Sequence, residues 1–485
     1  MESSIPLHSF DNTHFLRSLI ICMTFHFDDT FNVDELHESL KALLQKEDWK
    51  KLGGRILQRG YNRYGVRLVR PYEYGRVSVR FSEACFNMSI KDHALASKMF
   101  HQTDGPSVHP GVEQIRPLCT DGNGATSFKE YIGKSIPQIS LRVVTFTDGT
   151  LISVTWPHTM TDGRGWADVF RAWCAMLAKK PASIPRFMGY DLDNLEEFGF
   201  DQDIERSVLE PEKRPLSALP ARLVRQTANI FLDHKMESRV FCLPADTIEE
   251  LDSKTTDNMT SFYWVTEADV VKGWATNVIC SHMGSSNRRV CIHSFFDLRD
   301  KLTDRFPAVG AFIQNATFPY LTQLRAIDLV HGPFGDTAVA VRKSCLQQGT
   351  PEQLAATAKL LRTSGMRDRY PVLGDPDGYH VYFLDWSNSG LLNAIDFSSA
   401  VEESSDADSD DTSIRPAGDD KDKADKGKPS HFQVDIVSKS DLYRQDVFNL
   451  YGRDRGGNYW FGAVLHRKAM GRLEAEMARL QHARA

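Results

Sequence analysis

The chain has 485 residues and a formal net charge of −6, with 41% hydrophobic and 25% charged residues, as ordinary globular proteins have. Because one hydrophobic core rarely serves more than about 250–300 residues, two domains are expected. Residues 402–428 hold ten acidic and five basic side chains, so the rest of the chain is nearly neutral. That balance excludes the broadly basic surface of a nucleic-acid-binding protein.

Cysteine spacing and the N-terminus indicate a protein of the cytoplasm. None of the eight cysteines belongs to a Cys-x-x-Cys pair, so neither a zinc site nor a redox dithiol is predicted. The N-terminus lacks the basic and apolar regions of a secretory signal. No uncharged apolar run reaches the roughly 18 residues that a membrane helix needs. We therefore expect a cytoplasmic chain with buried thiols and no membrane insertion.

The N-terminal part alternates between strand-like and helical patterns. Residues 16–25 are rich in branched and aromatic side chains, which predicts a strand. Leucines then recur at helical spacing between positions 36 and 44, and Asn32 or Asp34 can cap this helix. Residues 53–57 end the helix and open another extended run.

A hairpin leads to the most informative pattern, Pro157-His158-Thr159-Met160-Thr161-Asp162-Gly163. Residues 141–146 and 151–156 flank Thr147-Asp148-Gly149, which predicts two paired strands. Aromatic side chains then recur every three to four residues up to Leu177, which predicts an amphipathic helix whose aromatic stripe belongs to the core. His158 is therefore expected at a strand end, where a neutral imidazole can take a proton near pH 7; a buried structural histidine is the alternative.

Residues 181–220 contain five prolines and many charges without clear periodicity, which predicts a long crossover between two domains. A second α/β pattern follows. It has strands at 239–243 and 290–296, and between them a helix that Thr266 caps, with Asp269 as the acidic partner in its first turn.

Residues 401–430 form a segment rich in Ser, Asp and Lys with almost no apolar side chains. Such a segment cannot bury enough surface to offset the entropy of ordering. A disordered insert between two strands is therefore expected, with a regulatory acidic arm as the alternative. Ordered structure is expected to resume with strands at 431–437 and 458–461 and a terminal helix at 470–480.

Seven segments, in order along nearly the whole chain, resemble the BAHD acyltransferase superfamily in a divergent, fungal form. They are Pro6-Leu7-His8-Ser9-Phe10-Asp11; Leu36-x-x-x-Leu40 to Gly53-Gly54-Arg55; Pro157 to Gly163; Thr266 to Trp274; Asp297-Leu298-Arg299 with Pro307, Gly310 and Asn315-Ala316; Trp386-Ser387 to Asp396-Phe397; and Gly456-Gly457 through Met470. Each pattern is modest alone, but seven in the right order are specific. Members of this family move an acyl group from coenzyme A to an alcohol or an amine.

The resemblance implies an α/β fold of two chloramphenicol-acetyltransferase-like domains, each a mixed β-sheet with flanking helices, joined by a long crossover loop. The expected parts are a domain 1–180 with His158 and Asp162, a linker 181–220, and a domain 221–485 that includes the insert 401–430 and a part of 370–400 that packs with the first domain. A monomer with a solvent channel between the domains is expected.

The resemblance also implies the roles of individual residues. His158 is the general base for the attacking hydroxyl, and Asp162 turns away from it to pair with Arg299 of the other domain. The expected site residues are His158 as catalytic; Asp162, Gly163, Arg299 and Asp396 as structural; and Asn315, Trp386 and Ser387 as contacts to the substrate or coenzyme A. Acyl-CoA, acetyl-CoA by family analogy, is the co-substrate, and no metal or prosthetic group is needed.

Two segments depart from the family pattern. The family's Asp-Phe-Gly-Trp-Gly stands here as Asp396-Phe397-Ser398-Ser399-Ala400, so both glycines and the tryptophan are lost. In some members that tryptophan is linked to transition-state stabilisation, so the oxyanion donor of this chain is left unassigned. Residues 310–315 are also one residue longer than the family's Gly-Tyr-Phe-Gly-Asn.

The sequence thus predicts an acyltransferase that moves an acyl group from coenzyme A to a hydroxyl of a medium-sized apolar natural product, within a ternary complex. Acylation of an amine is one alternative. A non-catalytic scaffold relative is another, which the lost Gly-Trp-Gly favours and the retained motif around His158 opposes. Chloramphenicol acetyltransferases share the motif but are much shorter, and condensation domains carry a second histidine where this chain has Pro157.

Overall fold

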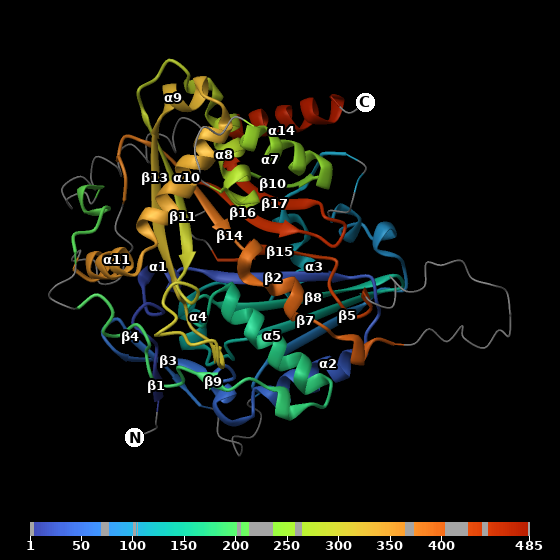
Figure 1. Ribbon diagram of the computed structural model, residues 1–485. Helices are drawn as coiled ribbons and strands as arrows, with labels where there is room; N and C mark the ends of the chain where they lie inside the picture. Colours follow the sequence, from blue (N-terminus) through green and yellow to red (C-terminus); the bar gives the residue numbers. More distant parts are fainter. Residues whose placement is uncertain are drawn as a thin grey trace.

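The computed structural model describes residues 4–68, 77–99, 103, 105–200, 205–212, 236–257, 264–363, 373–402, 425–438 and 445–483. Two large sheets organise these residues, one in the lower and one in the upper half of Figure 1. Both sheets contain parallel and antiparallel neighbours, and helices flank both. The α/β fold with mixed sheets that the sequence predicted is therefore confirmed.

The five-stranded sheet carries His158 directly after its central strand. Its strands in spatial order are β15 (His431–Ile436), β2 (Ile20–Phe27), β8 (Gly149–Pro157), β7 (Ser140–Phe146) and β5 (Arg80–Cys85). β7 and β8 form the predicted antiparallel hairpin. Every residue of β8 is buried: Ile152, Val154 and Trp156 belong to one of the two large core clusters, and Leu151 belongs to a smaller cluster.

The seven-stranded sheet supplies Arg299 and Asn315 from the ends of neighbouring strands. Its strands in spatial order are β13 (Thr317–Arg325), β11 (Arg289–Asp297), β14 (Tyr379–Asp385), β16 (Asp446–Arg453), β17 (Tyr459–His466), β10 (Met236–Leu243) and β6 (Ser107–Pro110). β11, β14 and β16 run parallel, and the remaining neighbours are antiparallel.

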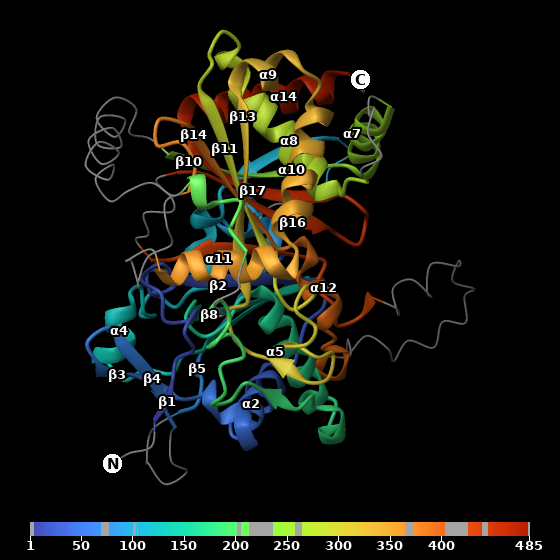
Figure 2. The same cartoon turned by 60° about the vertical axis from the view of Figure 1, so that its left-hand side comes forward.

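Long helices pack on both sheets. Both ribbon views place α2 (Val33–Leu43) and α5 (Gly163–Leu177) with the lower sheet, and α8 (Glu267–Cys280), α10 (Phe334–Gln348) and α14 (Arg467–His482) with the upper one (Figure 1, Figure 2). The other helices are α1 (His14–Arg17), α3 (Arg116–Cys119), α4 (Phe128–Gly133), α7 (Ala245–Asp257), α9 (Ala326–His331), α11 (Pro351–Thr363) and α12 (Leu391–Ala394). Two small sheets pair β1 (Ser4–Pro6), β4 (Arg63–Arg67) and β3 (Arg55–Gly60), and β9 (Phe187–Met188) with β12 (Ala311–Phe312).

Local sequence signals account for several element boundaries. The Asn32 side chain accepts a hydrogen bond from Glu35 N and begins α2, and Thr266 with Asp269 forms a reciprocal capping box at α8, as predicted. The aromatic stripe of α5 is buried in the core, also as predicted. The strand predicted at 16–25 begins only at Ile20, because Thr13 caps the short helix α1 ahead of it.

The two sheets exchange strands, so the halves of the chain interlock. β6 precedes His158 in sequence yet edges the seven-stranded sheet, and β15 comes from the C-terminal half yet edges the five-stranded sheet. Residues 391–400 pack against α5 in the lower core. The domain bounds 1–180, 181–220 and 221–485 stay a prediction.

Parts of two predicted segments lie outside the described residues. These are 403–424 of the insert predicted at 401–430, and 201–204 and 213–220 of the predicted crossover. Among the helices that the structure describes, none combines the length and the apolar character needed to cross a membrane.

Candidate active site

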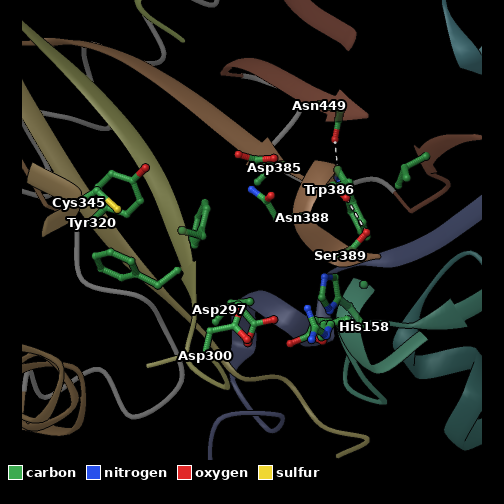
Figure 3. Close-up of a pocket in the computed structure, with 18 of the residues that line it drawn as sticks. His158, Asp297, Asp300, Tyr320, Cys345, Asp385, Trp386, Asn388, Ser389 and Asn449 are labelled. Carbon is green, nitrogen blue, oxygen red and sulfur yellow. Dashed lines mark hydrogen bonds between the residues drawn. The ribbon is translucent and has the colours of Figure 1, made fainter. Parts of the chain in front are cut away.

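The backbone of His158 is held on both sides by residues from other elements. β8 ends at Pro157, and His158 N donates to Leu19 O at 2.9 Å, just ahead of the neighbouring strand β2. The His158 carbonyl accepts a hydrogen bond of 2.8 Å from Asn315 Nδ2 of the C-terminal half. The His158 ring lines a cavity of about 420 Å³ (Figure 3). Because its Nδ1 atom is buried without a hydrogen-bond partner, we infer that Nε2 is the nitrogen that faces the cavity.

Both apolar and polar side chains line the cavity beside His158. The apolar side chains come from the N-terminal part and from strands of both sheets: Phe15, Leu16, Leu19, Ile21, Phe295, Leu384, Val434 and Ile436. The polar side chains include Asp269, Lys272, Asp300, Tyr320, Asp385 and Asn388. A second cavity of about 520 Å³ adjoins the first, because Thr266, Trp386, Asn388 and Ser389 line both.

Asp162 is fully engaged by donors other than His158. Arg299 donates to both of its carboxylate oxygens at 3.1 Å, Gly165 N donates to Oδ1 at 3.0 Å, and Ala316 N donates to Oδ2 at 2.8 Å. Burial alone would raise the pKa of Asp162, but the charge and hydrogen bonds of Arg299, with the two backbone donors, hold it below its ordinary value. Asp162 is therefore a carboxylate that joins the two halves of the chain and caps α5.

His158 is a neutral imidazole in this environment. Burial lowers its pKa below 6.5, although its own backbone carbonyl, the charge of Asp162 and the Asn315 side chain act in the opposite direction. A neutral ring with one accessible nitrogen can accept a proton from a group bound in the cavity. The arrangement can therefore perform general base chemistry.

Gly163 lets the ring of Trp386 pack directly beside the His158 loop. A Cβ at position 163 would lie 2.8 and 2.9 Å from two carbons of the Trp386 ring, closer than side-chain contacts allow. Trp386 has little room to retreat, because it is 9% exposed and its indole N–H donates to Asn449 Oδ1 at 3.4 Å (Figure 3). Gly163 therefore determines how closely the Trp386 ring, which lines the cavity, packs against the His158 loop.

Gly163→Ala is expected to destabilise the protein by about 1–3 kcal/mol, the usual cost of overpacking a core. The change is read from the denaturant midpoint of unfolding. Gly471→Ala is the matched control, because nothing lies within 4 Å of a Cβ at that position in α14. Since alanine is the better helix former, the control is expected to gain about 0.5–1 kcal/mol. A Gly163→Ala protein as stable as the wild type would show that Trp386 yields freely.

The structure brings most of the predicted site residues together; it places Asn315 behind the His158 loop and Asp396 on an exposed loop, and the predicted roles stay predictions. Trp386 lines both cavities and Ser387 the second one. Asn315, expected to contact substrate, instead hydrogen-bonds Asp11 and the His158 carbonyl. Asp396, expected at the active site, is exposed on the loop after α12 and accepts a hydrogen bond from Ser398 N.

The loop 396–400 is a core anchor in this chain. Phe397 is fully buried, with its ring centroid 4.7 Å from that of Trp173 and 5.8 Å from that of Phe27. Ala400 is buried in the same core, and its carbonyl accepts a hydrogen bond of 2.8 Å from Asn32 N at the start of α2. Ser389 and Asn388 are the polar side chains drawn beside Trp386 and above His158 (Figure 3).

Sequence reasoning missed the contribution of residues 314–316. Gln314 O accepts from Arg299 Nη2 at 2.7 Å and from Thr161 Oγ1 at 3.2 Å, Asn315 holds the His158 carbonyl, and Ala316 N binds Asp162. The resemblance of Asn315-Ala316 to the family pattern was the available signal. It could not reveal the contacts of these two residues, because their partners lie more than 150 residues away in sequence. In the described part of the chain, no cluster of His, Cys, Asp or Glu is arranged to hold a metal ion.

Comparisons with known proteins show what the whole chain is similar to. A model described as "Transferase family" matches residues 126–423. The chain is 28% identical to O-acetyltransferase PaAT-2 of Phomopsis amygdali over 99% of this chain and 98% of the relative. It is 29% identical to transcriptional regulator calD of Penicillium decumbens over 98% and 95% of the two chains. F. sporotrichioides TRI101, solved with coenzyme A and T-2, superposes with a TM-score of 0.65 at 14% identity and covers 98% of both chains.

Proposed function

Because the chain belongs to the Transferase family, the family that its BAHD-like segments resemble, we propose that it transfers an acetyl group from acetyl-CoA to a hydroxyl of a natural-product acceptor. The observation that carries the proposal is the state of His158. Its imidazole is neutral and faces the cavity through Nε2, while Asp162 is engaged by Arg299 and backbone donors. The names of relatives such as PaAT-2 support the acetyl group and the oxygen acceptor.

In the proposed reaction His158 acts as a general base and then as a general acid. Nε2 takes the proton of the acceptor hydroxyl while that oxygen attacks the thioester carbonyl, so the C–O bond forms without a free alkoxide. The tetrahedral intermediate then breaks its C–S bond, and the proton on His158 passes to the departing thiolate of coenzyme A. The ester and the free thiol leave, and the imidazole is neutral again.

The two adjoining cavities suit two different ligands. The apolar side chains that line the first cavity, Leu16, Phe295 and Val434 among them, fit the body of a medium-sized apolar acceptor. The second cavity carries the N-terminus of α8 at Thr266, the side chain of Arg453 and Asn388. A helix N-terminus and a guanidinium favour phosphate groups, so we place acetyl-CoA on that side, where its phosphates would compete with Glu267 for Arg453 and with the capping side chains of Thr266 and Asp269 for the helix N-terminus. The ligands would meet near Trp386 and Ser389, beside His158.

An assay of thiol release from acetyl-CoA tests the function. The protein is incubated with acetyl-CoA and a panel of apolar alcohols, each matched with an amine of the same carbon skeleton. We expect thiol release that depends on the alcohols, and products that gain the mass of one acetyl group and are cleaved by alkaline hydroxylamine, as oxygen esters are. Faster release with the amines, and products resistant to hydroxylamine, would assign the protein as an N-acetyltransferase instead.

A non-catalytic relative is the second candidate. The replaced glycines and tryptophan at 398–400 favour it, and one relative carries the name of a transcriptional regulator. This candidate predicts that acetyl-CoA binds without acceptor-dependent thiol release. Equilibrium binding of acetyl-CoA, measured beside the thiol assay, separates the two candidates.

A further inference from the structure

The opening motif that ends at Asp11, to which the proposed function gives no role, lies against the loop of His158. Asp11 is 4% exposed, and its Oδ1 accepts hydrogen bonds from Asn315 N at 2.7 Å and from Asn315 Nδ2 at 2.8 Å. The same Nδ2 group donates to the His158 carbonyl at 2.8 Å. Asp11 thus accepts from the backbone N–H and from the side-chain amide of Asn315, the residue whose side chain also binds the His158 carbonyl.

A buried histidine and a buried lysine hold Asp11 from the other side. Lys51 Nζ lies 3.3 Å from His8 Nε2, and His8 Nδ1 faces Asp11 Oδ2 at 3.5 Å. Burial, helped by the charge of Lys51, lowers the pKa of His8 to about 3, so its ring is neutral where it lies between Lys51 and Asp11. Lys51 in turn donates to Tyr190 O at 2.6 Å, which ties the network to the crossover.

The loop from His158 to Asp162 is therefore held at both ends by consecutive residues of the C-terminal half. Ala316 N and Arg299 hold the Asp162 end, and Asn315 holds the His158 end. The guanidinium of Arg299 secures the Asp162 end. The network of Lys51, His8, Asp11 and Asn315, called here the Asp11 clasp, secures the His158 end.

We propose that Asp11 is a positioning residue, which fixes the backbone carbonyl of His158 through Asn315 and thereby aims the imidazole into the cavity. A displacement of about 1 Å at a reacting group can cost about 100-fold in rate. When Asn315 is lost, the hydrogen bond from His158 N to Leu19 O is the one that still holds the backbone of His158. The ring can then pivot about that bond. The kinetic consequence rests on the proposed function, whereas the structural consequence does not.

Kinetic constants for acetyl-CoA and an active alcohol are measured for Asp11→Ala, Asn315→Ala and Asp11→Asn. We expect kcat to fall about 10- to 100-fold in both alanine variants, with KM for acetyl-CoA little changed, because neither residue lines either cavity. Asp11→Asn is expected to recover most of the rate. Burial raises the pKa of Asp11 to about 8, and Oδ1 accepts from Asn315 in either protonation state, as an amide oxygen also does.

Asp446→Ala is the matched control, since Asp446 is 2% exposed and accepts from His466 N at 2.7 Å, yet lines neither cavity. It is expected to lose stability without losing kcat. Unchanged kcat in both Asp11→Ala and Asn315→Ala, or an equal loss in the control, overturns the proposal. If Asp11→Ala does not fold, Asn315→Ala gives the same test from the other partner.

The NMR signal of the His158 ring, in protein with ¹³C-labelled histidine and assigned through His158→Gln, separates this proposal from the proposed function. We expect the signal to shift or broaden in Asp11→Ala and Asn315→Ala, to return in Asp11→Asn, and to stay unchanged in Asp446→Ala. This result supports the positioning role even if no acceptor is acetylated. An unchanged His158 signal in both alanine variants overturns it, whatever the kinetics of the wild type.

Discussion

Replacing His158 with alanine is expected to lower kcat for acetyl transfer about 10²- to 10⁴-fold, the range in which a general base contributes. The imidazole has the one accessible Nε2 atom and the lowered pKa that this role requires, and Asp162 is turned to Arg299 instead of supplying a second base. KM for acetyl-CoA should change little, because the ring holds no charge that binds phosphate. Thiol release at saturating acetyl-CoA measures the loss.

The fold of this variant serves as its control. The two backbone hydrogen bonds of residue 158, to Leu19 and from Asn315, do not involve the side chain, so thermal unfolding should stay close to that of the wild type. Full acetyl transfer by a folded His158→Ala protein would remove His158 from the mechanism.

The pH profile of the wild type supplies an independent signature of the same residue. The neutral ring is the active form, so kcat rises with pH through the pKa of His158 in the folded protein. Because burial lowers that pKa, the acidic limb is expected below pH 6.5. An acidic limb above 6.5 would point to a different titrating group, or to a ring that is more hydrated than the structure indicates.

Short-range features of this site were predictable from sequence because short-range forces set them. The hairpin, the loop with His158 and the helix that Asp162 begins follow from turn residues, side-chain periodicity and capping, which act over a few positions. The same holds for the capping box at Thr266. Pairing of Asp162 with Arg299, 137 residues apart, was inferred from the family resemblance and not from any local pattern.

Contacts between distant segments explain what the sequence did not reveal. Nothing in the local pattern around Asp11 indicates that its carboxylate meets Asn315, 304 residues away. The packing of Trp386 on Gly163 likewise depends on how the two sheets lie. Asp396 was expected at the active site because its segment resembles the family pattern. In the structure, the neighbouring Phe397 instead packs against the aromatic side chains of α5.

Asp162→Asn is expected to lower the free energy of unfolding by about 3–5 kcal/mol and to abolish most of the activity. The amide would remove the carboxylate that pairs with Arg299 across the two halves of the chain, and would leave this 8% exposed guanidinium with Asp297, at 3.2 Å, as its remaining carboxylate partner. Denaturant unfolding at pH 7 measures the loss. Asp328→Asn, which breaks the exposed Arg325–Asp328 pair, is the control and should leave stability nearly unchanged.

A double variant separates the effect of the buried charge on stability from the effect of Arg299 on the geometry of the site. Asp162→Asn combined with Arg299→Met removes both charges. The double variant should regain part of the stability, because an incompletely paired buried guanidinium costs more than the loss of the partner of Asp297, whose side chain is 25% exposed. It should not regain activity, since Arg299 also donates to Gln314 O and Phe312 O and so sets the course of the segment that holds His158. Equal stability of Asp162→Asn and the wild type would mean that water or a backbone shift solvates Arg299, and that this pair does not join the two halves.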